Sequence, residues 1–169
     1  MNVSLNFRQA AYASETERFL IALITLSHPD ITEDIRISTD PTARIAEYTT
    51  DSEVIYGTVS RGETFLFFPV RLNLPNDTDD GPGEMSIEID NVHQDYTEII
   101  RELTSPPTLT VELVMDNDLD TVEAQWPDFL LINVRYNATI IAGTLKLETL
   151  EQEPYPAGTF NPSYFPGLF

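Results

Sequence analysis

Short segments in which apolar and polar residues alternate run through most of this chain, and they constrain its fold more than any other feature. Met85, Ile87 and Ile89 alternate with acidic and hydroxyl residues, and the stretch 65–74 has the same period of two. This period predicts half-buried β-strands. The run 19–26 is apolar on both faces, which predicts a central strand covered on both sides. Further strands are expected at 54–59, 109–114, 121–126, 129–136 and 139–150.

Proline and asparagine indicate where these strands bend, end or turn. Pro69 has no backbone N–H to donate, so the segment 65–74 is expected at a sheet edge or around a bulge. An acidic, glycine-rich loop joins it to the strand 85–89, and we expect the two strands to form a hairpin. Asn137 and Ala138 predict a tight turn between the last two strands.

Two segments have helical patterns. Residues 5–13 follow Ser4, a favourable N-cap, and place Leu5 and Tyr12 seven positions apart on one side. Residues 92–103 carry a single apolar stripe, and a Ser-Pro-Pro sequence ends the pattern. The chain as a whole predicts a mainly β fold with a minor α component. We expect an antiparallel β-sandwich or barrel of roughly eight short strands with one flanking helix.

The last residues differ from the rest of the chain. After Glu153 there is no further charge, and four prolines and five aromatic residues follow. Prolines exclude a regular helix or a central strand, so we divide the chain into a β-rich domain, 1–152, and an extended arm, 153–169. The arm's apolar side chains must be buried, either on their own domain or on a neighbouring subunit. The predicted assembly residues are Phe7, Tyr12, Tyr155, Phe160, Tyr164, Phe165 and Phe169.

Composition excludes several classes of chemistry. Nine Lys and Arg against 28 Asp and Glu give a net charge of -19, which argues against a protein that holds nucleic acid tightly. The absence of cysteine excludes a disulfide framework, an iron–sulfur cluster, a thiolate zinc site and a cysteine nucleophile. The longest apolar run is far too short to cross a membrane, and we expect a protein made in a cytoplasm. Eight of the nine basic residues are Arg, and we expect each to pair with a carboxylate.

Catalytic and metal-binding patterns are weak. His28 and His93 are expected at the surface, and no G-x-S-x-G motif accompanies them. Asp116, Asp118 and Asp120 have the alternate spacing of a calcium loop, but the glycine and the glutamate that complete such a loop are missing. We therefore expect no catalytic residue, no cofactor and no bound metal.

Several segments together carry a resemblance to one protein family. They are 6–13 (NFRQAAYA), 55–62 (IYGTVSRG), 89–92 (IDNV), 105–107 (SPP), 126–129 (WPDF), 154–158 (PYPAG) and 165–169 (FPGLF). With these segments the sequence is similar to a domain-of-unknown-function family of small minor tail or distal tail proteins from long-tailed, siphovirus-type bacteriophages and prophages. The resemblance spans nearly the whole chain, although none of its motifs names a chemistry.

This resemblance implies a structural component of the virion, assembled in the host cytoplasm and located in the distal tail between tail tube and baseplate hub. It implies a fold of the tail-tube type and a homo-oligomeric ring, six-fold preferred and three-fold second. The implied partners are the tail tube protein, the tape measure protein and the baseplate hub proteins. DNA would pass without specific binding, because an acidic lumen repels phosphate, although the charge would serve solubility equally well. The candidate lumen residues are Asp77, Asp79, Asp80, Asp116, Asp118 and Asp120.

Two functions of other classes remain as alternatives. A receptor- or carbohydrate-binding sandwich at the tail tip would need an exposed aromatic platform around Trp126 or Tyr136. A cell-wall glycosidase would need two close carboxylates in a cleft, and no pair stands out among the 28 acidic residues.

Overall fold

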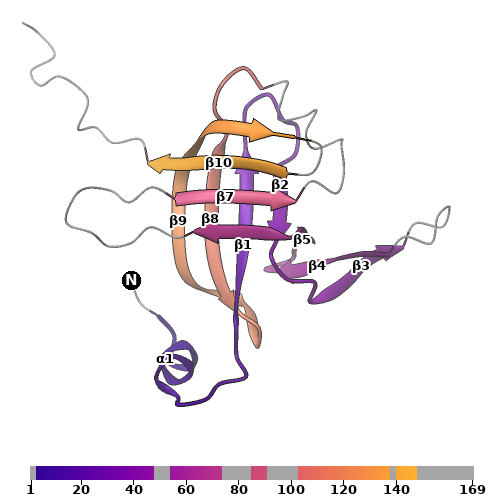
Figure 1. The fold of residues 1–169 in the computed structure, drawn as a ribbon. Coiled ribbons are helices and arrows are strands. Elements are labelled where there is room, and N and C mark those ends of the chain that lie inside the picture. The colour runs from indigo at the N-terminus through magenta and orange to yellow at the C-terminus, as the bar shows by residue number, and fades with distance from the viewer. Residues whose placement is uncertain (1–2, 48–53, 74–84, 91–102, 138–139, 148–169) are drawn as a thin grey trace, which may run out of the picture.

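The computed structural model describes residues 3–47, 54–73, 85–90, 103–137 and 140–147 (Figure 1). These residues form one helix and ten strands, so the prediction of a mainly β fold is confirmed. The elements are α1 (Leu5–Tyr12), β1 (Leu20–Ser27), β2 (Ile35–Ser38), β3 (Ala43–Glu47), β4 (Val54–Ser60), β5 (Glu63–Phe67), β6 (Val70–Asn73), β7 (Met85–Asp90), β8 (Thr108–Met115), β9 (Asp118–Tyr136) and β10 (Ile140–Leu147).

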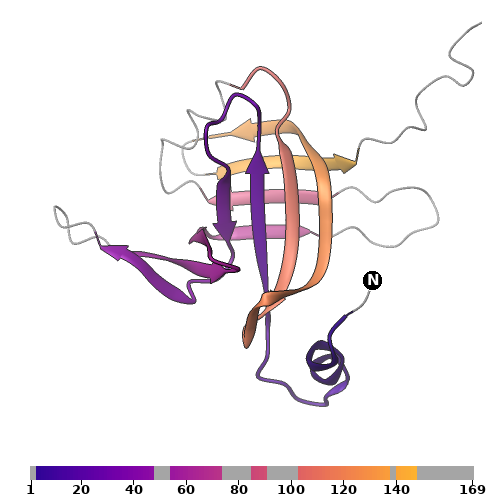
Figure 2. The ribbon, with the colours of Figure 1, turned by 180° about the vertical axis from the view of Figure 1, so that it is seen from behind.

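All ten strands belong to a single sheet with the order β3-β4-β5-β2-β1-β8-β9-β10-β7-β6. Every pairing is antiparallel except that of β2 with β5, which is parallel, so the sheet is mixed rather than purely antiparallel. Figures 1 and 2 show that β7 and β10 run across the direction of β1 and β8. The sheet therefore folds over itself into two layers, which agrees with a sandwich- or barrel-like body.

The core fills the space between these layers. Strand β1 is buried along most of its length and lies in the middle of the sheet, as the apolar run 19–26 predicts. Its inward residues meet side chains from the crossing strands in one cluster. The fully or nearly buried members are Ile24, Leu26, Ile37, Phe68, Met85, Ile87, Leu109, Val111, Phe129, Leu131 and Leu145.

Strand β9 corrects the prediction of two separate strands at 121–126 and 129–136. It is one continuous strand of 19 residues. Opposite it, Leu109 pairs with Phe129 and Val111 pairs with Trp126, so two residues of β9 face one residue of β8. This β-bulge contains a proline, which cannot donate a ladder hydrogen bond, and it bends the strand without ending it. The bend lets β9 pair with β8 along one part and with β10 along the next.

The prediction of a single strand at 65–74 is wrong, because the segment forms two separate strands. Its first part belongs to β5, which lies inside the sheet between β4 and β2, and only its second part, β6, lies at the predicted edge, where it forms the expected hairpin with β7. Pro69 stands between the two strands, where its missing N–H is needed by neither ladder. Beside the predicted turn after β9, the N–H of Asn137 donates to the carbonyl of Ile140 at 3.0 Å, while residues 138–139 lie outside the described residues. Residues 92–102 of the predicted helix and the arm 153–169 lie outside the described residues.

Candidate functional site

Helix α1 stands away from the β body at the N-terminal end of the chain (Figures 1 and 2). Ser4 caps it as predicted, because its hydroxyl oxygen accepts a hydrogen bond from the N–H of Phe7 at 3.1 Å. None of its residues is buried. Phe7 and Ala10 are half-buried, whereas Leu5 is 68% and Tyr12 is 90% exposed. The helix therefore presents apolar side chains to solvent on the side away from its half-buried face.

A buried carboxylate ties this helix to the sheet. The N–H of Ser4 donates to Oε2 of Glu123 at 2.7 Å, and the Ser4 hydroxyl donates to Oε1 at 2.5 Å. Glu123 lies on β9 and is 4% exposed. Each carboxylate oxygen thus receives a hydrogen bond, which compensates for the removal of the charge from water. Sequence reasoning missed this contact, because 119 positions separate the two residues.

Exposed hydrophobic residues concentrate in the N-terminal part of the chain. Among the described residues, seven large hydrophobic side chains are exposed, and four of them lie between positions 5 and 20. These four are Leu5, Tyr12, Phe19 and Leu20. Of the two N-terminal residues predicted for assembly, Tyr12 is thus fully available, while Phe7 is half-buried. Large apolar groups gathered on one projecting segment are typical of a protein–protein contact.

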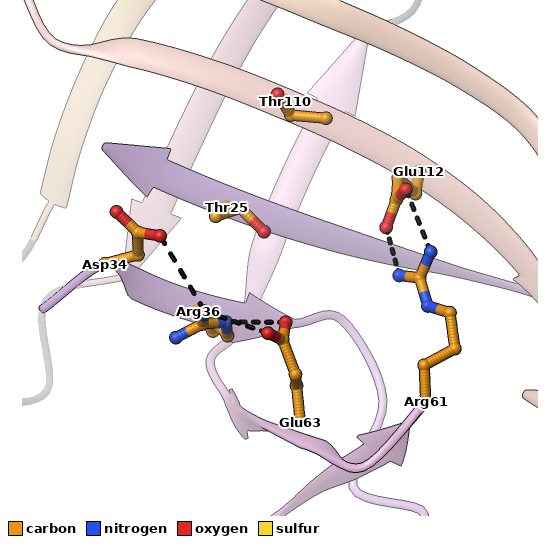
Figure 3. A pocket seen from close by; sticks show the side chains of 7 residues that line it. All are labelled: Thr25, Asp34, Arg36, Arg61, Glu63, Thr110 and Glu112. Carbon is orange, nitrogen blue, oxygen red and sulfur yellow. Dashed lines mark hydrogen bonds and ion pairs between the residues drawn. The ribbon is translucent and has the colours of Figure 1, made fainter. Parts of the chain in front are cut away.

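A polar groove of about 460 Å³ lies on another face of the sheet, between strands β1, β2 and β8 and the β4–β5 turn (Figure 3). Two arginine–glutamate pairs and two threonines dominate its walls. Its lining residues are Thr25, Asp34, Arg36, Arg61, Glu63, Thr110 and Glu112.

Each arginine of the groove binds a carboxylate through two nitrogens. Arg36 donates to Glu63 from Nε at 2.9 Å and from a terminal nitrogen at 3.1 Å. Arg61 donates through both terminal nitrogens to Glu112, one of them at 3.1 Å. The hydrogen bond with Glu112 raises the pKa of Arg61 above its usual value, and the negative charges of Glu112, Glu63 and Asp120 act in the same direction against the opposing effect of burial.

These pairs limit what the groove can do chemically. Both guanidinium groups already hold a carboxylate, so neither is available for an incoming phosphate or carboxylate. The groove joins the β4–β5 hairpin to β2 and β8, because Arg61 and Glu63 flank that turn and their partners lie on the neighbouring strands. Its arrangement fits a structural tie between parts of the sheet.

His28 contradicts the prediction of a surface histidine, since it is 8% exposed. Its Nε2 lies 2.6 Å from the hydroxyl of Ser105, and Oδ2 of Asp30 lies 3.6 Å from its Nδ1. The residue types match a Ser-His-Asp triad, although the chain separates Ser105 from His28 by 77 positions. No sequence motif indicated this arrangement.

The tautomer of His28 argues against nucleophilic catalysis. The backbone N–H of Asp30 donates to Nδ1 at 3.1 Å, so Nδ1 carries no proton when the ring is neutral. The proton then resides on Nε2, which donates to Ser105 and cannot accept the serine's proton as a general base must. The three residues therefore act as a clip between the loop after β1 and the segment that leads into β8.

The aspartates of the β8–β9 turn are partly engaged in ion pairs and hydrogen bonds. Asp116 pairs with Arg18 at 3.2 Å, and Asp120 accepts a hydrogen bond from the backbone N–H of Arg61 at 2.5 Å. Asp118 begins β9, so the three positions do not close into a calcium loop. The described part of the chain contains no group of three His, Asp or Glu side chains able to hold a metal ion.

The remaining predicted residues have mixed outcomes. The expected arginine–carboxylate pairing is confirmed for Arg18, Arg36, Arg61 and Arg71. Trp126 packs against the core cluster, which does not support an aromatic platform around it. Several predicted positions lie outside the described residues: His93, Asp77, Asp79, Asp80, Tyr155, Phe160, Tyr164, Phe165 and Phe169.

The fold and the groove define the class of this protein, an acidic β-sheet protein with a projecting helix and an internally paired polar groove. Residues 6–160 match the model of a family described as a domain of unknown function, DUF1833, and the chain belongs to that family. A comparison with curated proteins gives no match. Within the described residues, no helix has the length and apolar character needed to span a membrane.

Proposed function

We propose that this protein is a structural component of a bacteriophage tail that assembles as a homo-oligomeric ring near the tail tip. The observation that carries the proposal is the projecting helix α1, with Leu5 and Tyr12 exposed beside the exposed start of β1. A subunit that presents apolar groups on a slender extension gains stability when a neighbour covers them. The resemblance of the sequence to siphovirus-type minor tail proteins supplies the biological setting.

The charge of the chain supports a place in a DNA conduit. At -19, the subunit repels phosphate, and a ring of such subunits would let a duplex pass without adhering. Asp118 and Asp120 lie in the first residues of β9, next to the β8–β9 turn, where they would contribute to such a surface if that end of the sheet faces the channel. The proposed neighbours are the tail tube protein, the tape measure protein and the baseplate hub proteins, and the proposed location is the virion.

The ion-paired groove and the His28 clip support a structural role over an enzymatic one. Both use their polar groups to connect strands and loops of the same chain, and neither leaves a general base opposite a nucleophile. No cofactor is part of the proposal.

Negative-stain imaging of the purified full-length chain tests this function. We expect rings with a central hole, six-fold in preference and three-fold otherwise. The double variant Leu5→Ser, Tyr12→Ser removes the exposed apolar groups of α1 and should abolish the rings. Tyr136→Ser is the matched control, because it removes an exposed aromatic residue from β9, away from the helix, and should leave the rings intact. Particles that remain single subunits at every concentration would contradict the proposal.

A further inference from the structure

Residues 3–17 form a unit that a second copy of the chain can accept. We call this unit the N-terminal arm, and 'arm' in the following paragraphs means these residues and not the predicted C-terminal arm 153–169. Its direct side-chain tie to the β body is the pair of hydrogen bonds from Ser4 to Glu123. Arg18 and Phe19 then fix the following residues, through the ion pair with Asp116 and through a hydrogen bond from the N–H of Asp116 to the carbonyl of Phe19 at 3.2 Å.

Between these two attachments runs a short connection, residues 13–17, in which every residue is exposed. It contains neither glycine nor proline. Five residues extend over up to about 17 Å, which sets the distance over which the helix could be placed on a neighbouring copy. The connection therefore has the length and the freedom from packing that a hinge for exchange between subunits requires.

From these observations we propose that Glu123 is the receptor for the N-terminal arm of a neighbouring copy, so that subunits of the ring exchange their arms. This inference rests on the ring of the proposed function. The exchanged contact is the one already present within the chain, with the Ser4 N–H and hydroxyl on the two oxygens of Glu123. Exchange thus sacrifices no hydrogen bond of the arm.

The exposed side of α1 is apolar surface that exchange would place at the interface between two subunits. Within one chain, Leu5 and Tyr12 remain exposed although Phe7 is half-buried. An arm that lies between two subunits has one body on its half-buried side and the other on its exposed side. Apolar burial on the second side then adds to the unchanged hydrogen bonds, and a closed ring lets every subunit both give and receive an arm.

Site-specific cross-linking distinguishes the two forms, because the chain has no cysteine of its own. One variant carries Asn6→Cys on α1, and a second carries Gln125→Cys, two positions from Glu123 on β9; both parent residues are exposed. The two variants are co-expressed, the rings are purified and a flexible bismaleimide is added. Exchange predicts covalent dimers of the two variants. Asn73→Cys on the edge strand β6 replaces Gln125→Cys as the control for chance cross-linking.

The receptor role of Glu123 is tested in the same format. Glu123→Gln removes the charge from both hydrogen bonds and should reduce the yield of covalent dimers about tenfold. Ser4→Ala removes the hydroxyl that donates to Glu123 and should also reduce the yield of covalent dimers. This second variant keeps the test valid if Glu123→Gln folds poorly. Undiminished dimer yield in both variants would overturn the assignment of Glu123.

The outcomes also separate this inference from the proposed function. Intact rings in which a chain carrying both Asn6→Cys and Gln125→Cys cross-links only within itself would overturn the exchange and leave the ring in place. Single subunits without rings would overturn both.

Discussion

The pair between Arg61 and Glu112 allows a quantitative test of what holds the groove together. Two nitrogens of the guanidinium meet the carboxylate, whose side chain is 11% exposed while that of Arg61 is 38% exposed. At an effective dielectric constant of about 20, unit charges about 4 Å apart attract by about 4 kcal/mol. Desolvation of the carboxylate and solvent screening at the more exposed guanidinium offset most of this. We expect a net coupling of about 1–2 kcal/mol.

A double-mutant cycle measures this coupling directly. The variants are Arg61→Ala, Glu112→Gln and the two combined, each unfolded in urea to obtain the free energy of unfolding. Arginine and alanine both carry a Cβ, so the energetic cost of the positive φ of 52° at position 61 is the same in every variant. This cost therefore cancels in the cycle. Arg61→Ala alone should cost about 2 kcal/mol, because it leaves Glu112 buried without its charged partner.

The pair between Arg71 and Glu88 is the matched control. It has a similar N–O distance of 2.9 Å, but its side chains are 78% and 36% exposed. A surface pair of this kind should couple by about 0.3 kcal/mol. Equal couplings in the two cycles, or a coupling below about 0.5 kcal/mol at Arg61, would refute the argument that burial of the carboxylate makes the groove pair the stronger tie.

Three further predictions concern the site and the sheet. The coupling at Arg61 should be the same at pH 7 and pH 10, because the hydrogen bond with Glu112 raises the pKa of Arg61 above its usual value and the guanidinium stays charged over this whole range; a decline by pH 10 in urea unfolding would contradict this. Ser105 should not react with a fluorophosphonate probe, since His28 donates to it, and labelling detected by mass spectrometry would restore the hydrolase alternative. Gly57→Ala should lower the free energy of unfolding by about 3 kcal/mol, because the added Cβ would lie 2.1 Å from a backbone carbonyl oxygen. In Gly143→Ala the nearest atom to the added Cβ belongs to a movable side chain, so this variant should lose about 1 kcal/mol. Equal melting temperatures of the two variants would contradict this difference.

Alternation of apolar residues predicted most strands, because a half-buried strand must follow a period of two. The buried run at β1 and the hairpin of β6 with β7 follow from local chemistry. The N-cap at Ser4 is equally local. These features depend on residues close together in the chain, which is why the sequence contains enough information to predict them.

The features that sequence reasoning missed depend on partners far away. The continuity of β9 through Pro127 requires a bulge opposite β8, and the parallel pairing of β2 with β5 has no local signal. His28 is buried, and its hydrogen-bond partner Ser105 lies 77 positions away in the chain. Glu123 has no distinctive neighbours in the sequence, and its place as the anchor of α1 appears only when β9 and the N-terminus are brought together.

The mass of the assembled protein under native conditions tests the central claim most directly. Native mass spectrometry of the full-length chain should give a closed oligomer of about six times 19.1 kDa or, as the second expectation, of about three times 19.1 kDa. The same sample should lose this species when Leu5 and Tyr12 are both replaced by serine. A spectrum that contains only the 19.1 kDa chain, at every concentration at which the protein stays folded, would contradict the account.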